Sequence, residues 1–68
     1  MFKKNDILVI VDKKNPYYLK LGKIVVLEEG ILVVEFPSIS KFTREGELDN
    51  VSFVEEDLRT ICKILVVR

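Results

Sequence analysis

One cysteine, Cys62, and the lack of any histidine constrain this 68-residue chain more than any other feature of its sequence. Domains below roughly 70–80 residues often depend on disulfides, a bound metal or a partner surface for their stability. A single thiol cannot form an intramolecular disulfide, and a Cys/His metal cage cannot be built without histidine. The sequence therefore predicts one domain over residues 1–68, stabilised by good packing or by a partner, with no cofactor and no metal.

The composition is that of a chain that folds in water. Hydrophobic residues make up 49% and charged residues 32%, with zero net charge, which is typical of a globular domain and not of a disordered chain. The longest apolar runs, Ile7 to Val11 and Ile64 to Val67, fall far short of the roughly 20 residues of a membrane span. Because no signal-peptide pattern follows Met1, we expect the mature chain to begin there, in a reducing compartment.

Short apolar blocks separated by charged residues, glycine and proline predict an all-β fold. Strands are expected at residues 6–11, 23–27, 31–36, 51–54 and 60–67, with one helical turn at 55–58 and a polar, turn-forming stretch at 38–50. Five short strands with a helical turn before the last is the order of a small SH3-like barrel. An OB-fold is the alternative, but it would need longer strands and a helix between the third and fourth.

Two glycines are expected to be structural. Gly30 ends the segment Glu28-Glu29-Gly30, which suits a three-residue hairpin with a bulge. Gly22 opens the second strand, where we expect the backbone to pass close to the loop of Tyr17 and Tyr18 or to take a positive φ.

Catalytic chemistry finds little support in the residue types. Without histidine there is no ready base at neutral pH, and the serines and threonines have no apparent triad partner. Cys62 lies within an apolar run, which indicates a buried, unreactive thiol. The acidic turn of Glu55, Glu56 and Asp57 lacks the glycine and the further acids of a calcium loop. The sequence therefore predicts that the chain is not an enzyme.

Charge is unevenly distributed along the chain. Residues 1–27 carry six lysines against two aspartates, a balance of +4, and the remainder carries a balance of −4. Lysines and tyrosines cluster in the first loop, where they would suit an acidic protein or a phosphate backbone. Alternatively, the lysines are merely solvated and one tyrosine caps the barrel. The predicted partner-binding residues are Lys13, Lys14, Tyr17, Tyr18, Lys20 and Lys23.

Four segments of the sequence resemble small SH3-like subunits of photosynthetic electron-transfer complexes. These are the SH3-like subunit of photosystem I, the ferredoxin-docking subunit of the photosynthetic NADH-dehydrogenase-like complex, and a small subunit of the cytochrome bf complex. In the first two, a pair of aromatics stands shortly before a glycine, as Tyr17 and Tyr18 stand before Gly22. Where the photosystem I protein has Arg-Pro-Glu-Ser, this chain has Asp12-Lys13-Lys14-Asn15. The arginine that contacts ferredoxin in that family is therefore replaced at best by a lysine. The matching segments are residues 5–10, 16–25, 31–36 and 53–58.

This resemblance implies a non-catalytic accessory subunit that stabilises a membrane complex and helps acidic ferredoxin to dock. It also implies a peripheral position on the cytoplasmic or stromal side of the thylakoid membrane; without it, we expect a cytoplasmic protein. Two alternatives remain: an RNA- or ribosome-binding barrel of the KOW type, which zero net charge and an isoelectric point near 6.2 disfavour, and a generic interaction module. For such a module we also expect self-association through Ile61 to Val67, because this segment is more apolar than one strand of a small barrel requires.

Overall fold

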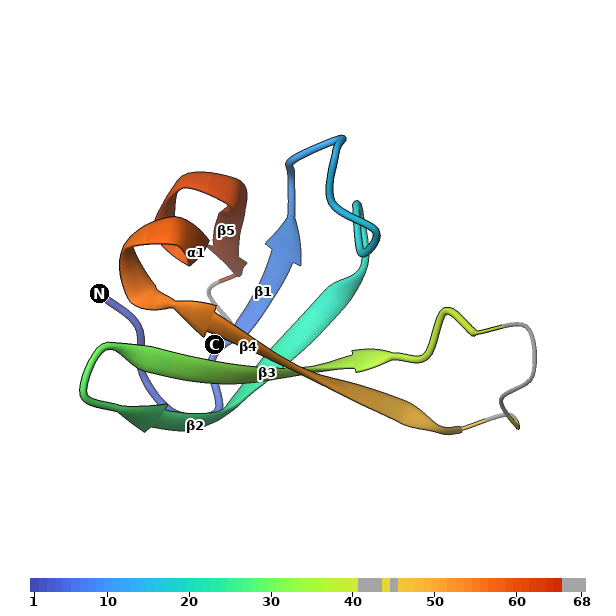
Figure 1. The fold of residues 1–68 in the computed structure, drawn as a ribbon, viewed down its shortest axis with the longest axis horizontal. Helices are drawn as coiled ribbons and strands as arrows, with labels where there is room; N and C mark the ends of the chain where they lie inside the picture. The colour runs from blue at the N-terminus through green and yellow to red at the C-terminus, as the bar shows by residue number, and fades with distance from the viewer. Residues whose placement is uncertain (41–43, 45, 66–68) are drawn as a thin grey trace.

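The computed structural model describes residues 1–40, 44 and 46–65. This part of the chain forms a single five-stranded antiparallel sheet in the order β4-β3-β2-β1-β5, with one short helix before the last strand (Figure 1). The elements are β1 (Ile7–Ile10), β2 (Leu21–Glu28), β3 (Ile31–Pro37), β4 (Leu48–Val54), α1 (Glu55–Ile61) and β5 (Cys62–Leu65). The predicted fold class, a small all-β SH3-like arrangement, is confirmed.

The sheet is strongly bent but not closed, because β4 and β5 form its two edges. β2 takes part in both halves of the sheet, since Leu21 to Lys23 pair with β1 and Lys23 to Glu28 pair with β3. The pairing of β2 with β3 skips a residue between Ile24 and Val26, which is a β-bulge. In Figure 1, β3 and β4 cross the lower part of the molecule, and β1, β5 and α1 lie above them.

The core lies on the inner face of this bent sheet. Alternate residues of β1 and β3 point inward, as the two-residue period of a strand requires, and Leu58 of α1 covers them. Among the described residues no polar or charged side chain is buried. Eight hydrophobic side chains form the core: Phe2, Leu8, Ile10, Ile24, Leu32, Val34, Phe36 and Leu58.

Several predicted boundaries were wrong. β4 begins at Leu48, not at Val51, because the polar Asp49 and Asn50 pair with β3 instead of forming a turn. The helical segment extends to Ile61, well beyond the single turn predicted, so β5 begins at Cys62 and not at residue 60. The last two residues of that predicted strand, 66 and 67, lie outside the described residues.

The hairpin between β2 and β3 differs from its prediction as well. Glu28 pairs directly with Ile31, so only Glu29 and Gly30 form the loop, at φ values of 48° and 80°. Two successive positive φ values define a type I′ turn, whose twist suits two-residue hairpins. Gly30 is therefore structural as predicted, but the bulge lies inside β2 and not in the loop.

Gly22 is structural for a reason that the sequence did not show. It pairs with Leu8 of β1, and its φ is not positive. A β-carbon at this position would lie 2.5 Å from Cε1 of Phe36 and 2.6 Å from Cγ1 of Val34. The close neighbours are thus core side chains of β3, and not the Tyr17 loop that we expected.

Candidate functional site

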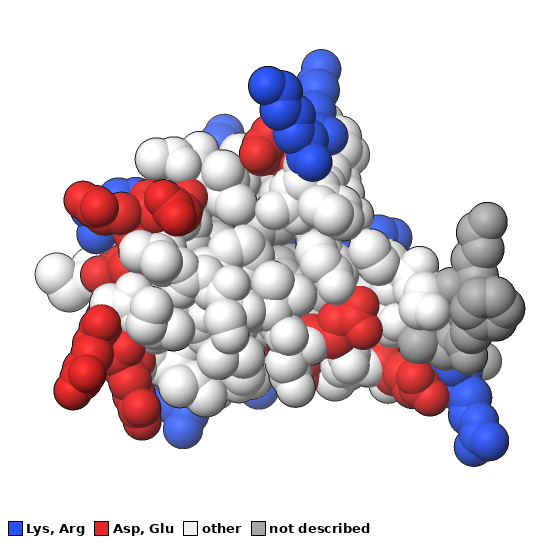
Figure 2. Space-filling view, viewed as in Figure 1, with Lys and Arg blue, Asp and Glu red and all other residues white. Residues whose placement is uncertain are grey.

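The loop between β1 and β2 holds most of the predicted partner-binding residues. Lys13, Lys14 and Lys20 are exposed, and Figure 2 shows a cluster of basic side chains where this loop lies, at the top of the view. Side-chain acceptors fix the loop backbone: Lys14 N donates to Asp12 Oδ1 at 3.0 Å, and the backbone nitrogen of residue 17 donates to Asn15 Oδ1 at 2.9 Å. Asx turns of this kind form locally, so the loop has a defined shape.

Tyr17 points from this loop towards the core. Its ring stacks on Phe36 with 4.6 Å between ring centroids, and its hydroxyl donates a hydrogen bond of 2.8 Å to Asp49 Oδ2. The hydrogen bond to Asp49 raises the pKa of Tyr17, and desolvation adds to the effect. The structure thus shows the alternative in which one tyrosine caps the barrel, and Tyr17 serves as the anchor of the loop.

Leu19 is a residue of this loop that the sequence analysis missed. Its side chain is 63% exposed, and its backbone has a φ of 62°, which is unfavourable for any residue with a β-carbon other than Asn or Asp. A hydrogen bond of 2.8 Å from Leu19 N to Ile10 O holds this conformation, next to a bridge between Tyr18 and Ile10. No sequence pattern marks a leucine for positive φ, so only the structure reveals it. We define the loop patch as Lys13, Lys14, Leu19 and Lys20.

The remaining two predicted residues lie outside the loop patch. Tyr18 is half-buried at the bridge to β1. Lys23 lies within β2, exposed, with Ile7 and Glu35 as its direct neighbours on β1 and β3. Three of the four predicted lysines therefore lie in the loop between β1 and β2, and Lys23 lies on the sheet.

Acidic residues gather at another part of the surface. Glu55, Glu56 and Asp57 form the first turn of α1, where negative charge is favourable near the helix N-terminus. A backbone hydrogen bond of 2.8 Å from Glu55 N to Gly30 O ties this turn to the hairpin that carries Glu29. Figure 2 shows acidic side chains in this region, on the left of the view. The described residues contain no group of three or more His, Cys, Asp or Glu arranged to hold a metal ion.

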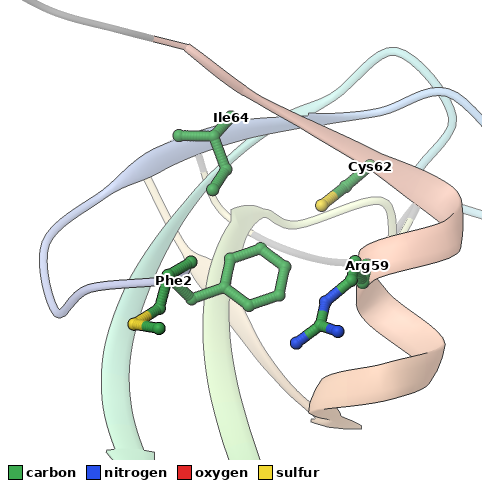
Figure 3. Close-up of a pocket in the computed structure, with 5 residues that line it drawn as sticks. Phe2, Arg59, Cys62 and Ile64 are labelled. Carbon is green, nitrogen blue, oxygen red and sulfur yellow. The ribbon is translucent and has the colours of Figure 1, made fainter.

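A pocket of about 250 Å³ opens between the N-terminal segment, α1 and β5. Figure 3 shows Phe2, Arg59, Cys62 and Ile64 around it, and Met1 is the fifth lining residue. Cys62 is half-buried, and desolvation raises the pKa of its thiol. A raised pKa keeps the thiol protonated at neutral pH and disfavours reactivity.

β5 is an edge strand, which bears on the expected self-association through Ile61 to Val67. Ile61, Cys62 and Ile64 pack against the core, whereas Lys63 and Leu65 are exposed. Most apolar side chains in the described part of this segment are therefore covered by the core of the same chain. Pairing of its free edge with a second copy stays a prediction.

Comparisons with known proteins add no relative to this picture. No protein-family model, curated protein or solved structure matches the chain. The resemblance to photosynthetic subunits therefore depends on the sequence segments alone. In the part of the chain that the structure describes, no helix is long and apolar enough to cross a membrane.

Proposed function

We propose that this chain is a non-catalytic protein-binding module that docks an acidic partner through the loop patch. The observation that carries this proposal is Leu19, an exposed aliphatic side chain held at positive φ in the same loop as three exposed lysines. A leucine at positive φ costs roughly 1–2 kcal/mol. Strained residues of this kind cluster at binding and active sites, where the surrounding structure maintains them.

The composition of the loop patch favours a protein over a nucleic acid. Three lysines supply long-range attraction to an acidic surface, and Leu19 supplies apolar area to bury on contact. A phosphate backbone would engage the lysines but would leave Leu19 in water. The net charge of zero and the separate acidic region at α1 also weaken binding to a polyanion.

The narrower form of the proposal is an accessory subunit of a photosynthetic electron-transport complex, with acidic ferredoxin as the docked partner. Its support is the resemblance of residues 5–10, 16–25, 31–36 and 53–58. In this form the module carries no redox centre, lies at the cytoplasmic or stromal side of the thylakoid membrane, and uses the loop patch to hold ferredoxin near its electron donor.

Titration with an acidic ferredoxin at low and at physiological ionic strength tests the proposal. Binding should weaken as salt shortens the Debye length to about 8 Å. Lys13→Glu combined with Lys14→Glu should weaken it further, with a melting temperature within a few degrees of the original because exposed charges contribute little to folding. Lys3→Glu with Lys4→Glu makes the same change of charge at exposed positions outside the loop, and should have the smaller effect.

Two outcomes would contradict the proposal. If ferredoxin does not bind at low salt, the narrower form fails. If the chain is instead retained on a polyanion column at low salt, and Lys13→Glu with Lys14→Glu abolishes retention, the loop patch binds nucleic acid and the KOW-type alternative is the better description.

A further inference from the structure

We propose that the pocket between the N-terminal segment, α1 and β5 binds an apolar group that ends in a carboxylate. Its lining residues are Met1, Phe2, Arg59, Cys62 and Ile64. None of them belongs to the loop patch, so this site is independent of the proposed docking function.

Apolar side chains form part of the walls of the pocket. Phe2 is only 6% exposed and its ring forms part of the wall, together with the half-buried side chain of Ile64 (Figure 3). The thiol of Cys62 also faces the pocket in Figure 3 and stays uncharged at neutral pH, because burial disfavours its thiolate. A hydrocarbon chain or an aliphatic side chain would find apolar surface on several sides, as small-molecule sites typically provide.

Among the described residues that line the pocket, Arg59 has the only charged side chain. It is exposed on the last turn of α1, and its guanidinium reaches towards Phe2 at the side of the pocket in Figure 3. A guanidinium presents parallel N–H donors that match the two oxygens of a carboxylate. A guanidinium beside apolar side chains therefore favours a ligand with one anionic end and an apolar body.

The volume limits the size of that ligand. About 250 Å³, at about 30 Å³ for each water-sized atom, accommodates on the order of eight heavy atoms. This is enough for the carboxyl end of a medium-chain fatty acid or for the side chain and carboxylate of the C-terminal residue of a peptide, which share the same chemistry. Ligands of this size with one charged contact bind with dissociation constants on the order of 1 mM.

The single cysteine of the chain provides the readout. Ligand in the pocket should shield Cys62 from alkylation by iodoacetamide, by about tenfold at a ligand concentration ten times the dissociation constant. Octanoate represents the fatty acid and N-acetyl-leucine represents a peptide C-terminus. Octanamide and N-acetyl-leucinamide are the matched neutral ligands, and they should protect weakly or not at all.

Arg59→Gln should remove the preference for the carboxylate over the amide. Lys63→Gln is the matched control, because Lys63 is an exposed cation on β5 that does not line the pocket. Both residues are exposed, so both variants should fold, which a thermal melt would verify. Protection by octanoate alone identifies a fatty-acid site, and protection by N-acetyl-leucine identifies a site for a peptide C-terminus. Protection by neither, equal protection by the amides, or unchanged protection in Arg59→Gln would overturn the proposal.

Discussion

The hydroxyl of Tyr17 donates a hydrogen bond of 2.8 Å to Asp49 Oδ2 and so joins the β1–β2 loop to β4. The ring of Tyr17 lies on Phe36 of the core, and Phe36 in turn meets Phe53 edge-on with 6.3 Å between centroids. Asp49 also accepts a longer bond of 3.4 Å from Ile39 N. Tyr17 therefore holds the loop that carries Lys13, Lys14 and Leu19 against β3 and β4 of the sheet.

Tyr17→Phe should lower the free energy of unfolding by about 1 kcal/mol, because it removes this hydrogen bond but keeps the aromatic stack. Tyr18→Phe is the matched control, since the hydroxyl of Tyr18 makes no hydrogen bond to the described residues, and it should leave stability nearly unchanged. Urea denaturation of the three proteins measures the difference. Equal stability of both variants would mean that the bond to Asp49 contributes nothing.

The same contact predicts a loss of stability at alkaline pH. The pKa of Tyr17 is raised above its ordinary value of 10.0 in the folded protein, chiefly by the hydrogen bond to Asp49. As the pH rises past about 10, the unfolded chain releases this proton while the folded chain retains it, so ionisation favours unfolding. Stability should therefore fall from about pH 10 upwards, and less steeply in Tyr17→Phe. Parallel curves for the two proteins would contradict this assignment.

The sequence predicted the fold well because local patterns determine it. β3 was predicted from its short block of apolar, mostly β-branched residues, and in the structure every second residue of it, Leu32, Val34 and Phe36, fills the core. β4 was placed too late because Asp49 and Asn50 are turn formers by propensity, and their pairing with Phe36 and Glu35 is a tertiary effect.

The candidate site was less predictable for the same physical reason. The cluster of lysines is a local feature of residues 13–20, and sequence reasoning found it. Whether Tyr17 faces a partner or the core depends on Phe36 and Asp49, which are distant in sequence. The pocket is still less visible, because it joins Phe2 to Arg59 and Ile64, and no spacing relates them.

Gly22→Ala should destabilise the protein by about 1–3 kcal/mol, because its β-carbon would lie within 2.6 Å of both Phe36 and Val34. Gly22→Val should cost more. Phe36→Leu is destabilising in itself, but it removes the nearest atoms, so Gly22→Ala should cost less in that background. A double-mutant cycle by denaturation measures this coupling. Additive effects would show that overpacking against Phe36 is not the cause.

Glu29→Asn should stabilise the hairpin by about 0.5–1 kcal/mol. Glu29 has a φ of 48° and precedes Gly30, whose φ is 80°, and asparagine followed by glycine is the preferred pair for a type I′ turn. Glu28→Asn is the control, since Glu28 lies in β2, where asparagine has no such advantage. A lower melting temperature for Glu29→Asn than for the original protein would mean that the glutamate makes a compensating interaction.

Leu19→Gly should weaken binding of the partner without lowering the stability of the protein. Glycine relieves the strain at a φ of 62°, worth roughly 1–2 kcal/mol, but makes the unfolded chain more flexible, which costs about 0.5–1 kcal/mol. The free energy of unfolding should therefore stay the same or rise by up to about 1.5 kcal/mol. Loss of the exposed side chain should nevertheless weaken docking of the acidic partner, because it removes the apolar side chain of the loop patch.

Leu58→Ala is the contrasting variant. Leu58 is fully buried and lies outside the loop patch, so this substitution should lower the free energy of unfolding by about 2–5 kcal/mol and leave binding by the folded protein unchanged. Calorimetric melts and ferredoxin titrations of both variants give the comparison. A large loss of stability in Leu19→Gly would assign the leucine a structural role. Unchanged binding with unchanged stability would leave the strain at Leu19 without a function, and docking would then have to depend on the lysines alone.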